Sequence, residues 1–414
     1  MSKKLFNRDF VLLWVGQAVS QLGSSVGFIA IMWWVQRKTG SALALGSLAM
    51  VQTFVSFLLS PVAGVISDRI NRKWIIVLTD LIRGIVNCLF AYAAWKGHLA
   101  LPWIFFGSAI NAASSQFFLP SIAACLPQLV GREYLEKANS LREMTGNISG
   151  IFGYALGGVL VAFFGIPLIL LLNGVSFILS ALSELFIIIP DVQEKAKMNI
   201  KLFFDDLKVG INYIKNDKFL SRFLKVIVLV NFSFIPFMVL LPYFVENHLN
   251  ASSSVFGYIN SANTIGMLIG ALILTLTSFL KRHIWFLKWG LSIQAAALFL
   301  APLIPGQYWI VHLLIYGLFG LVNSIINISF MSSIQRTVDP SYMGKVFSLI
   351  YAVAMSLQPL ASGLSGVITE YIGISIVFMS CAVLGVFSNI LMARISGLEG
   401  FFDPLSSDED ALTA

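Results

Sequence analysis

Long apolar stretches, each followed by a short polar one, recur along the whole chain. Most are about 20 residues long, the length that a helix needs to cross the hydrocarbon core of a bilayer. We therefore predict an all-α membrane protein with twelve transmembrane helices. The predicted spans cover 10–34, 42–66, 74–95, 101–124, 144–165, 167–190, 223–245, 254–280, 284–304, 308–332, 346–369 and 373–395.

The longest hydrophilic interruption separates the sixth span from the seventh, which predicts two six-helix bundles. We expect the two halves to be structural repeats of one another. The predicted domains are an N-terminal bundle over 1–190, a cytoplasmic linker over 191–222, a C-terminal bundle over 223–395 and a cytoplasmic tail over 396–414.

The linker combines lysines with apolar residues at spacings of three and four, the pattern of an amphipathic helix. We expect it to lie on anionic lipid of the cytoplasmic leaflet. A calmodulin-like or nucleic-acid site remains an alternative. The apolar positions are Ile200, Phe203, Phe204, Leu207, Ile211 and Ile214, and the lysines are Lys195, Lys197, Lys201, Lys208, Lys215 and Lys218.

Positive charge predicts the orientation of the spans. If the N-terminus is cytoplasmic, only Arg37, Lys38 and Lys96 of the 27 Lys and Arg residues fall outside. The positive-inside rule therefore predicts that both termini are cytoplasmic. The basic residues before the first span resemble a signal peptide, but the apolar run that follows is too long for one, so we expect a retained helix.

Composition supports a membrane protein and argues against other classes. Hydrophobic residues make up 57% of the 414 residues and charged residues 11%, where a soluble protein has about 25% charged residues. The cysteines Cys88, Cys125 and Cys381 are isolated in apolar runs, so we expect neither a disulfide framework nor a metal site, and no cofactor. The net charge of +7 lies in loops between spans, which favours membrane topology over nucleic-acid binding.

A charged turn between the second and third spans carries the pattern Gly-x-x-x-Asp-Arg-x-x-Arg-Lys. Its residues are Gly64, Asp68, Arg69, Arg72 and Lys73. A charged turn between two spans must lie at the membrane surface, because charge at bilayer depth is costly. The pattern resembles the loop signature of the major facilitator superfamily of transporters. That resemblance implies the fold of the family and a cytoplasmic latch between its two halves.

The carboxylate of this turn has a possible partner across the halves. We expect Asp68 to face the N-terminus of the eleventh helix, near 343–347, where the helix dipole favours an anion. Gly64 would let the two backbones approach closely.

Ionisable residues inside the spans are scarce and are candidates for proton coupling. Asp80 and Arg83 share a helix face in the third span and can pair. This pair either locks the third span against the latch or frees the latch when Asp80 takes up a proton. Glu184, about two turns from the inner end of the sixth span, either binds a proton or a cationic drug, or reaches the interface and pairs with a linker lysine.

The fifth span contains a glycine motif formed by Gly150, Gly153, Gly157 and Gly158. It resembles the motif of the antiporter branch, G-x-x-x-G-P-x-x-G-G, with Tyr154 in place of the proline. Small-residue faces of this kind are also ordinary packing surfaces.

Further matches resemble the drug:proton antiporter group that contains bacterial macrolide-efflux proteins. Many members of that group have an acidic residue after the position of Gly23, where this chain has Ser24 and Ser25. The matching segments are 14–20, 39–41, 80–83, 118–120, 138–139 and 342–349.

Uncharged polar residues in the spans should face a partner or a cavity. With nearby Phe and Met they would form a large pocket suited to amphiphiles. The cavity candidates are Gln21, Gln52, Asn111, Asn231, Asn263, Asn327 and Gln358.

The sequence thus favours a proton-coupled secondary exporter of hydrophobic or amphiphilic, macrolide-like drugs in a bacterial cytoplasmic membrane. Its partners would be a small amphiphilic substrate and protons, and the sequence is compatible with a monomer. Export of a lipid or siderophore, or a non-transporting sensor, remain alternatives. ATP-binding and zinc-protease motifs are absent, and the four histidines are isolated, so an enzyme is not expected.

The latch hypothesis generates a first prediction. Asp68→Asn should leave the protein in the membrane but strongly impair efflux, because the helix dipole loses its anionic partner. Macrolide accumulation in cells and the amount of membrane-inserted protein should be measured together. Normal efflux by a well-expressed variant would contradict the latch.

Overall fold

The computed structural model describes helices throughout, and no strand occurs in the described parts of the chain. The linker core, the tail, Asp68, Arg69 and the segment 343–347 lie outside those parts, so the expectations that concern them stay predictions. The described residues are 5–67, 70–131, 134–189, 218–276, 283–337, 350 and 353–395.

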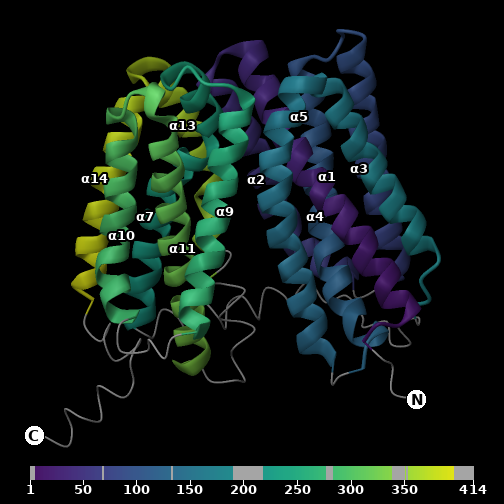
Figure 1. Ribbon diagram of the computed structural model, residues 1–414. Coiled ribbons are helices and arrows are strands. Elements are labelled where there is room, and N and C mark those ends of the chain that lie inside the picture. Colours follow the sequence, from purple (N-terminus) through teal and green to yellow (C-terminus); the bar gives the residue numbers. More distant parts are fainter. Residues whose placement is uncertain are drawn as a thin grey trace, which may run out of the picture. The chain divides into compact units, whose positions relative to one another are not determined.

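The chain divides into two compact units, and each is described by itself. Unit 1 comprises Met1–Met198 and Ala251–Ser261, and unit 2 comprises Asn199–Asn250 and Ala262–Ala414. Five helices form most of unit 1 (Figure 1): α1 (Arg8–Thr39), α2 (Ala42–Ser67), α3 (Arg72–Trp95), α4 (Leu101–Leu129) and α5 (Leu135–Leu185).

The 51-residue helix α5 is broken in its middle. Gly165 has a φ of 77° and Pro167 follows it. A positive φ is readily available only to glycine, and proline cannot continue the hydrogen bonding of the preceding turn. Two helical segments therefore meet at this kink, between the predicted fifth and sixth spans.

The described part of unit 2 contains four short elements between its long helices, one of which is the three-residue α8 (Leu241–Tyr243). Phe244–His248 is a π-helical turn, and Ala301–Leu303 and Gly306–Tyr308 are single 3-10 turns. The helices are α7 (Lys218–Val239), α8 (Leu241–Tyr243), most of α9 (Ser253–Leu276), α10 (His283–Leu300), α11 (Trp309–Thr337), α13 (Gln358–Ile372) and α14 (Ile374–Ala393).

Nine helices of the described residues are long and apolar enough to cross a membrane, fewer than the twelve predicted spans. Helix α5 counts once although its kink divides it. The apolar part of α10 is short, covering Trp289–Leu303 with the turn that follows. The predicted eleventh span, 346–369, is described only in part.

Glycines allow α1 to pack against both segments of α5. A Cβ at Gly23 would clash with Ser176, and one at Gly153 would lie 2.5 Å from the Cβ of Ser25. Of the glycine motif, Gly153 and Gly157 face α1. Gly158 faces the start of α9, where the Ser253 hydroxyl donates to its carbonyl at 3.0 Å. The motif is therefore a helix-packing surface.

A matched pair of alanine substitutions tests this surface. Gly153→Ala should cost about 1–3 kcal/mol of unfolding free energy, because the new methyl overlaps the backbone-proximal atoms of Ser25 and overpacks the contact. Gly146→Ala, two turns earlier on α5, meets only the Gln21 Oε1 at 3.2 Å and should be tolerated. Thermal unfolding of both purified variants should be compared, and equal melting temperatures would contradict the packing role.

Candidate functional site: a buried charge cluster

Three ionisable side chains meet in the interior of unit 1. Asp80 and Arg83 lie one turn apart on α3, and Glu184 lies on α5. Their exposed fractions are 0%, 9% and 1%. We call these three residues the charge cluster.

Arg83 is held from three helices. Its Nη1 lies 3.4 Å from Asp80 Oδ1, and its Nη2 donates to the Ser115 hydroxyl of α4. The guanidinium also lies 5.1 and 5.2 Å from the ring centroids of Phe118 and Phe177. These are cation–π distances, so one side chain joins α3, α4 and α5.

Glu184 is the third member of the charge cluster, and Ser180 connects it to Asp80. The Ser180 hydroxyl donates to Glu184 Oε1 at 3.4 Å and also interacts with Asp80. Both carboxylates interact electrostatically with each other and with Arg83. Ser180 therefore interacts with both carboxylates.

The placement of Glu184 corrects its predicted depth. Helix α5 ends at Leu185, so Glu184 lies in the last turn and not two turns inside. The side chain nevertheless turns inward and is 1% exposed, unlike a glutamate that reaches the interface. The linker lysines proposed as its partners lie outside the described residues.

Several polar atoms of the charge cluster have no hydrogen-bond partner among the described residues. They are Asp80 Oδ2, Glu184 Oε2 and Arg83 Nε. A buried polar atom without a partner is costly. The two carboxylate oxygens can each take a proton or accept from a donor, and Arg83 Nε can donate to an acceptor.

Two asparagine side chains extend the polar contacts along the α3–α5 interface. The Asn87 Nδ2 donates to the Arg83 carbonyl at 2.8 Å. The Asn173 Nδ2 in turn donates to Asn87 Oδ1 at 3.1 Å. Sequence reasoning missed most of these partners. The sequence does contain a signal for Asn87, because Asp80, Arg83 and Asn87 lie on one face of α3.

Arg72 ties the charged turn between α2 and α3 to α4. Arg72 donates from Nε to the Ser67 carbonyl at 3.3 Å and from Nη1 to the Ala124 carbonyl at 3.2 Å. Asn71 caps α3 by accepting from the Lys73 amide at 3.0 Å. Gly64 lies on α2.

The seven cavity candidates are divided between the two units. Gln21, Gln52 and Asn111 belong to unit 1, and the other four belong to unit 2. Two of those four are satisfied within their unit: Asn231 donates to the Ala354 carbonyl at 3.3 Å, and exposed Asn327 donates to Asn323.

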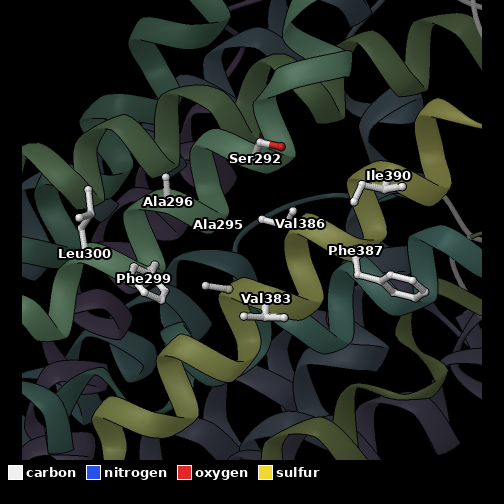
Figure 2. A pocket seen from close by; sticks show the side chains of 10 residues that line it. Ser292, Ala295, Ala296, Phe299, Leu300, Val383, Val386, Phe387 and Ile390 are labelled. Atoms are coloured by element: carbon white, nitrogen blue, oxygen red, sulfur yellow. The ribbon is translucent and has the colours of Figure 1, made fainter.

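Unit 2 contains an apolar groove of about 570 Å³ between α10 and α14, which the sequence did not predict. None of the seven cavity candidates is among its lining residues. Figure 2 shows small side chains at Ala295 and Ala296 and large ones at Phe299 and Phe387. The other lining residues are Ser292, Leu300, Ala382, Val383, Val386 and Ile390.

Comparison with known proteins decides the family. The family model of the Major Facilitator Superfamily matches residues 13–358 and 226–404. The chain belongs to the major facilitator superfamily. It is therefore a transporter and not an enzyme, in agreement with the sequence analysis.

Relatives and solved structures agree with this assignment. Macrolide efflux protein A of Streptococcus pyogenes is 24% identical over 380 residues, covering 91% of this chain and 93% of its own. Macrolide efflux protein A of Enterococcus faecalis is 23% identical, over 78% of this chain and 99% of its own. Such bacterial relatives and the apolar helices identify a multi-pass protein of the bacterial plasma membrane.

The fold itself has many solved neighbours. The nucleoside transporter NupG has a TM-score of 0.72 at 16% identity, covering 94% of this chain and 99% of its own. A bacterial homologue of the iron transporter ferroportin has a TM-score of 0.71 at 16% identity, covering 96% and 99%. At these identities the likeness shows the fold alone.

The contacts of Arg83 lead to a graded stability prediction. Arg83→Lys keeps the charge but loses the planar fork that reaches both Asp80 and Ser115, and should cost about 1.5–3 kcal/mol. Arg83→Gln removes the counter-charge of two buried carboxylates and should cost about 3–5 kcal/mol.

Thermal unfolding of the purified variants at neutral pH measures their order of stability. Adding Asp80→Asn to Arg83→Gln should restore part of the loss, because it removes one uncompensated carboxylate. Equal stability of the Lys and Gln variants would show that the charge of Arg83 is not what stabilises unit 1.

Proposed function

We propose that this transporter is a proton-coupled secondary exporter of hydrophobic or amphiphilic, macrolide-like drugs that works by alternating access. The main support is the similarity to macrolide efflux protein A along nine-tenths of both chains. A match of that extent covers both halves of the transporter and not one shared segment.

The proposal includes a specific topology. Twelve spans would form two six-helix bundles over 1–190 and 223–395, with both termini, the linker and the tail in the cytoplasm. The positive-inside distribution of Lys and Arg supports this orientation. The linker would lie on anionic lipid through its lysines.

Proton coupling is supported by the scarcity and burial of charge in unit 1. Ionisable groups are costly to bury in a membrane domain, and those that occur there are paired or mark functional positions. The chain also lacks a phosphate-binding loop for ATP. A proton gradient is therefore the energy source that we propose.

The substrate class is supported by the apolar nature of the chain and by uncharged polar side chains in its spans. The seven cavity candidates offer hydrogen bonds without fixed charge, which suits large amphiphiles of varied shape. A lipid or a siderophore has similar physical properties, so both belong in the test.

Transport in inverted membrane vesicles tests the energy source. Erythromycin uptake should follow an imposed proton gradient without ATP and should stop when a protonophore is added. Vesicles from cells without the protein give the background. Uptake that survives the protonophore but needs ATP would refute proton coupling.

The same vesicles test the substrate class. A macrolide, a fluorescent phospholipid analogue and a ferric siderophore should be offered in parallel under one proton gradient. We expect accumulation of the macrolide only. Accumulation of the lipid analogue or siderophore alone would replace the drug-export proposal with that alternative.

A further inference from the structure

We propose that the charge cluster of Asp80, Arg83 and Glu184 is the proton-binding site, and that it holds one proton shared between its two carboxyl groups. This inference rests on the proposed proton coupling and names the groups that would carry it. It follows from the charge balance of the charge cluster and from the position of Ser180.

Charge balance requires a proton. With all three groups ionised, two carboxylates face one guanidinium, and the charge cluster has a net charge of −1. A net charge buried at 0–9% exposure is strongly unfavourable. One proton on either carboxylate makes the charge cluster neutral and leaves one carboxylate to pair with Arg83.

Among the residues that the structure describes, α1 and α4 place no second cation against the two carboxylates. Helix α4 contains no Asp, Glu, Lys or Arg, and α1 presents Gly16 to Ser180. Cys125 of α4 interacts electrostatically with Glu184 and with Arg72 of α3, and Asp9 of α1 accepts from the Ile188 amide at 3.2 Å. Of the described side chains, Arg83 is the cation that interacts with both carboxylates.

The geometry allows the two carboxyl groups to share the proton. Asp80 Oδ2 and Glu184 Oε2 each lack a hydrogen-bond partner among the described residues. The Ser180 hydroxyl interacts with both carboxylates and can donate to one while it accepts from the other. When the proton moves from one carboxyl group to the other, the hydroxyl can rotate so that it donates to whichever group is then ionised.

Proton exchange with water requires a local opening. A hydronium ion would transfer its proton to a carboxylate oxygen, forming one O–H bond and leaving water, and release would reverse the step. Glu184 lies in the last turn of α5, and Cys125 interacts with both Glu184 and the latch residue Arg72. The opening would therefore occur at the end of unit 1 that carries the latch.

Infrared difference spectroscopy of the purified protein tests the shared proton without any substrate. A pH step on the wild type should reveal the carbonyl stretch of a protonated carboxylic acid, with the shift in deuterium oxide expected of an exchangeable proton. Glu184→Gln and Asp80→Asn should each abolish the band, because each leaves one carboxylate paired with Arg83 at zero net charge.

Glu143→Gln is the matched control, because Glu143 lies on the same helix but is exposed. It should keep the wild-type band. Thermal unfolding checks that each variant is folded, and either of the two cluster variants alone is enough to decide if the other fails to fold.

Two results would overturn the proposal. Absence of a titrating carboxylic acid band in the wild type would show that no proton is held. Persistence of the band in a folded Asp80→Asn or Glu184→Gln variant would show that the proton is not shared. A third outcome is that the two cluster variants lose the band but export by the wild type does not need a proton gradient. That outcome would support the proton site and refute the proposed function.

Discussion

Balance of charge in an apolar interior is the constraint on which unit 1 depends. Three helices meet at Arg83, whose guanidinium contacts a carboxylate, a hydroxyl and two aromatic faces. In a membrane there is no hydrophobic driving force between helices, so packing and polar contacts decide how they associate. The charge cluster therefore specifies the arrangement of α3, α4 and α5, in addition to the proton binding that we propose for it.

Glycine packing and the charge cluster support each other. A Cβ at Gly16 would lie 2.5 Å from Ser183 Oγ and 3.2 Å from Ser180 Oγ. The absence of that Cβ lets α1 close over the face of α5 on which Ser180 and Glu184 lie. This close contact excludes water from the carboxylates, which is why their charge must be balanced from within unit 1.

Sequence reasoning succeeds where the relevant signal is local. Apolar run length predicts an all-helical membrane protein, although nine and not twelve membrane-length helices are found among the described residues. The i, i+3 spacing of Asp80 and Arg83 predicts a pair that is found at 3.4 Å. It does not predict that Glu184 joins them, because this depends on how α3 packs against α5. For the same reason, polarity alone does not show which polar residues of different helices share a cavity, so the cavity candidates, Asn327 among them, stay predictions.

Helix α3 connects the charge cluster to Arg72 of the charged turn for which we predict a latch role. Arg72 binds the Ala124 carbonyl of α4, and Arg83 binds Ser115 of the same helix. These anchors are 11 residues apart on α3, or about 16 Å along a rigid helix. A change at one anchor can therefore reach the other only by moving α3 against α4 as a whole or by opening the end that carries Arg72. The second route breaks two carbonyl contacts and leaves the buried Arg83 in place, so it is the less costly way to admit water to Glu184.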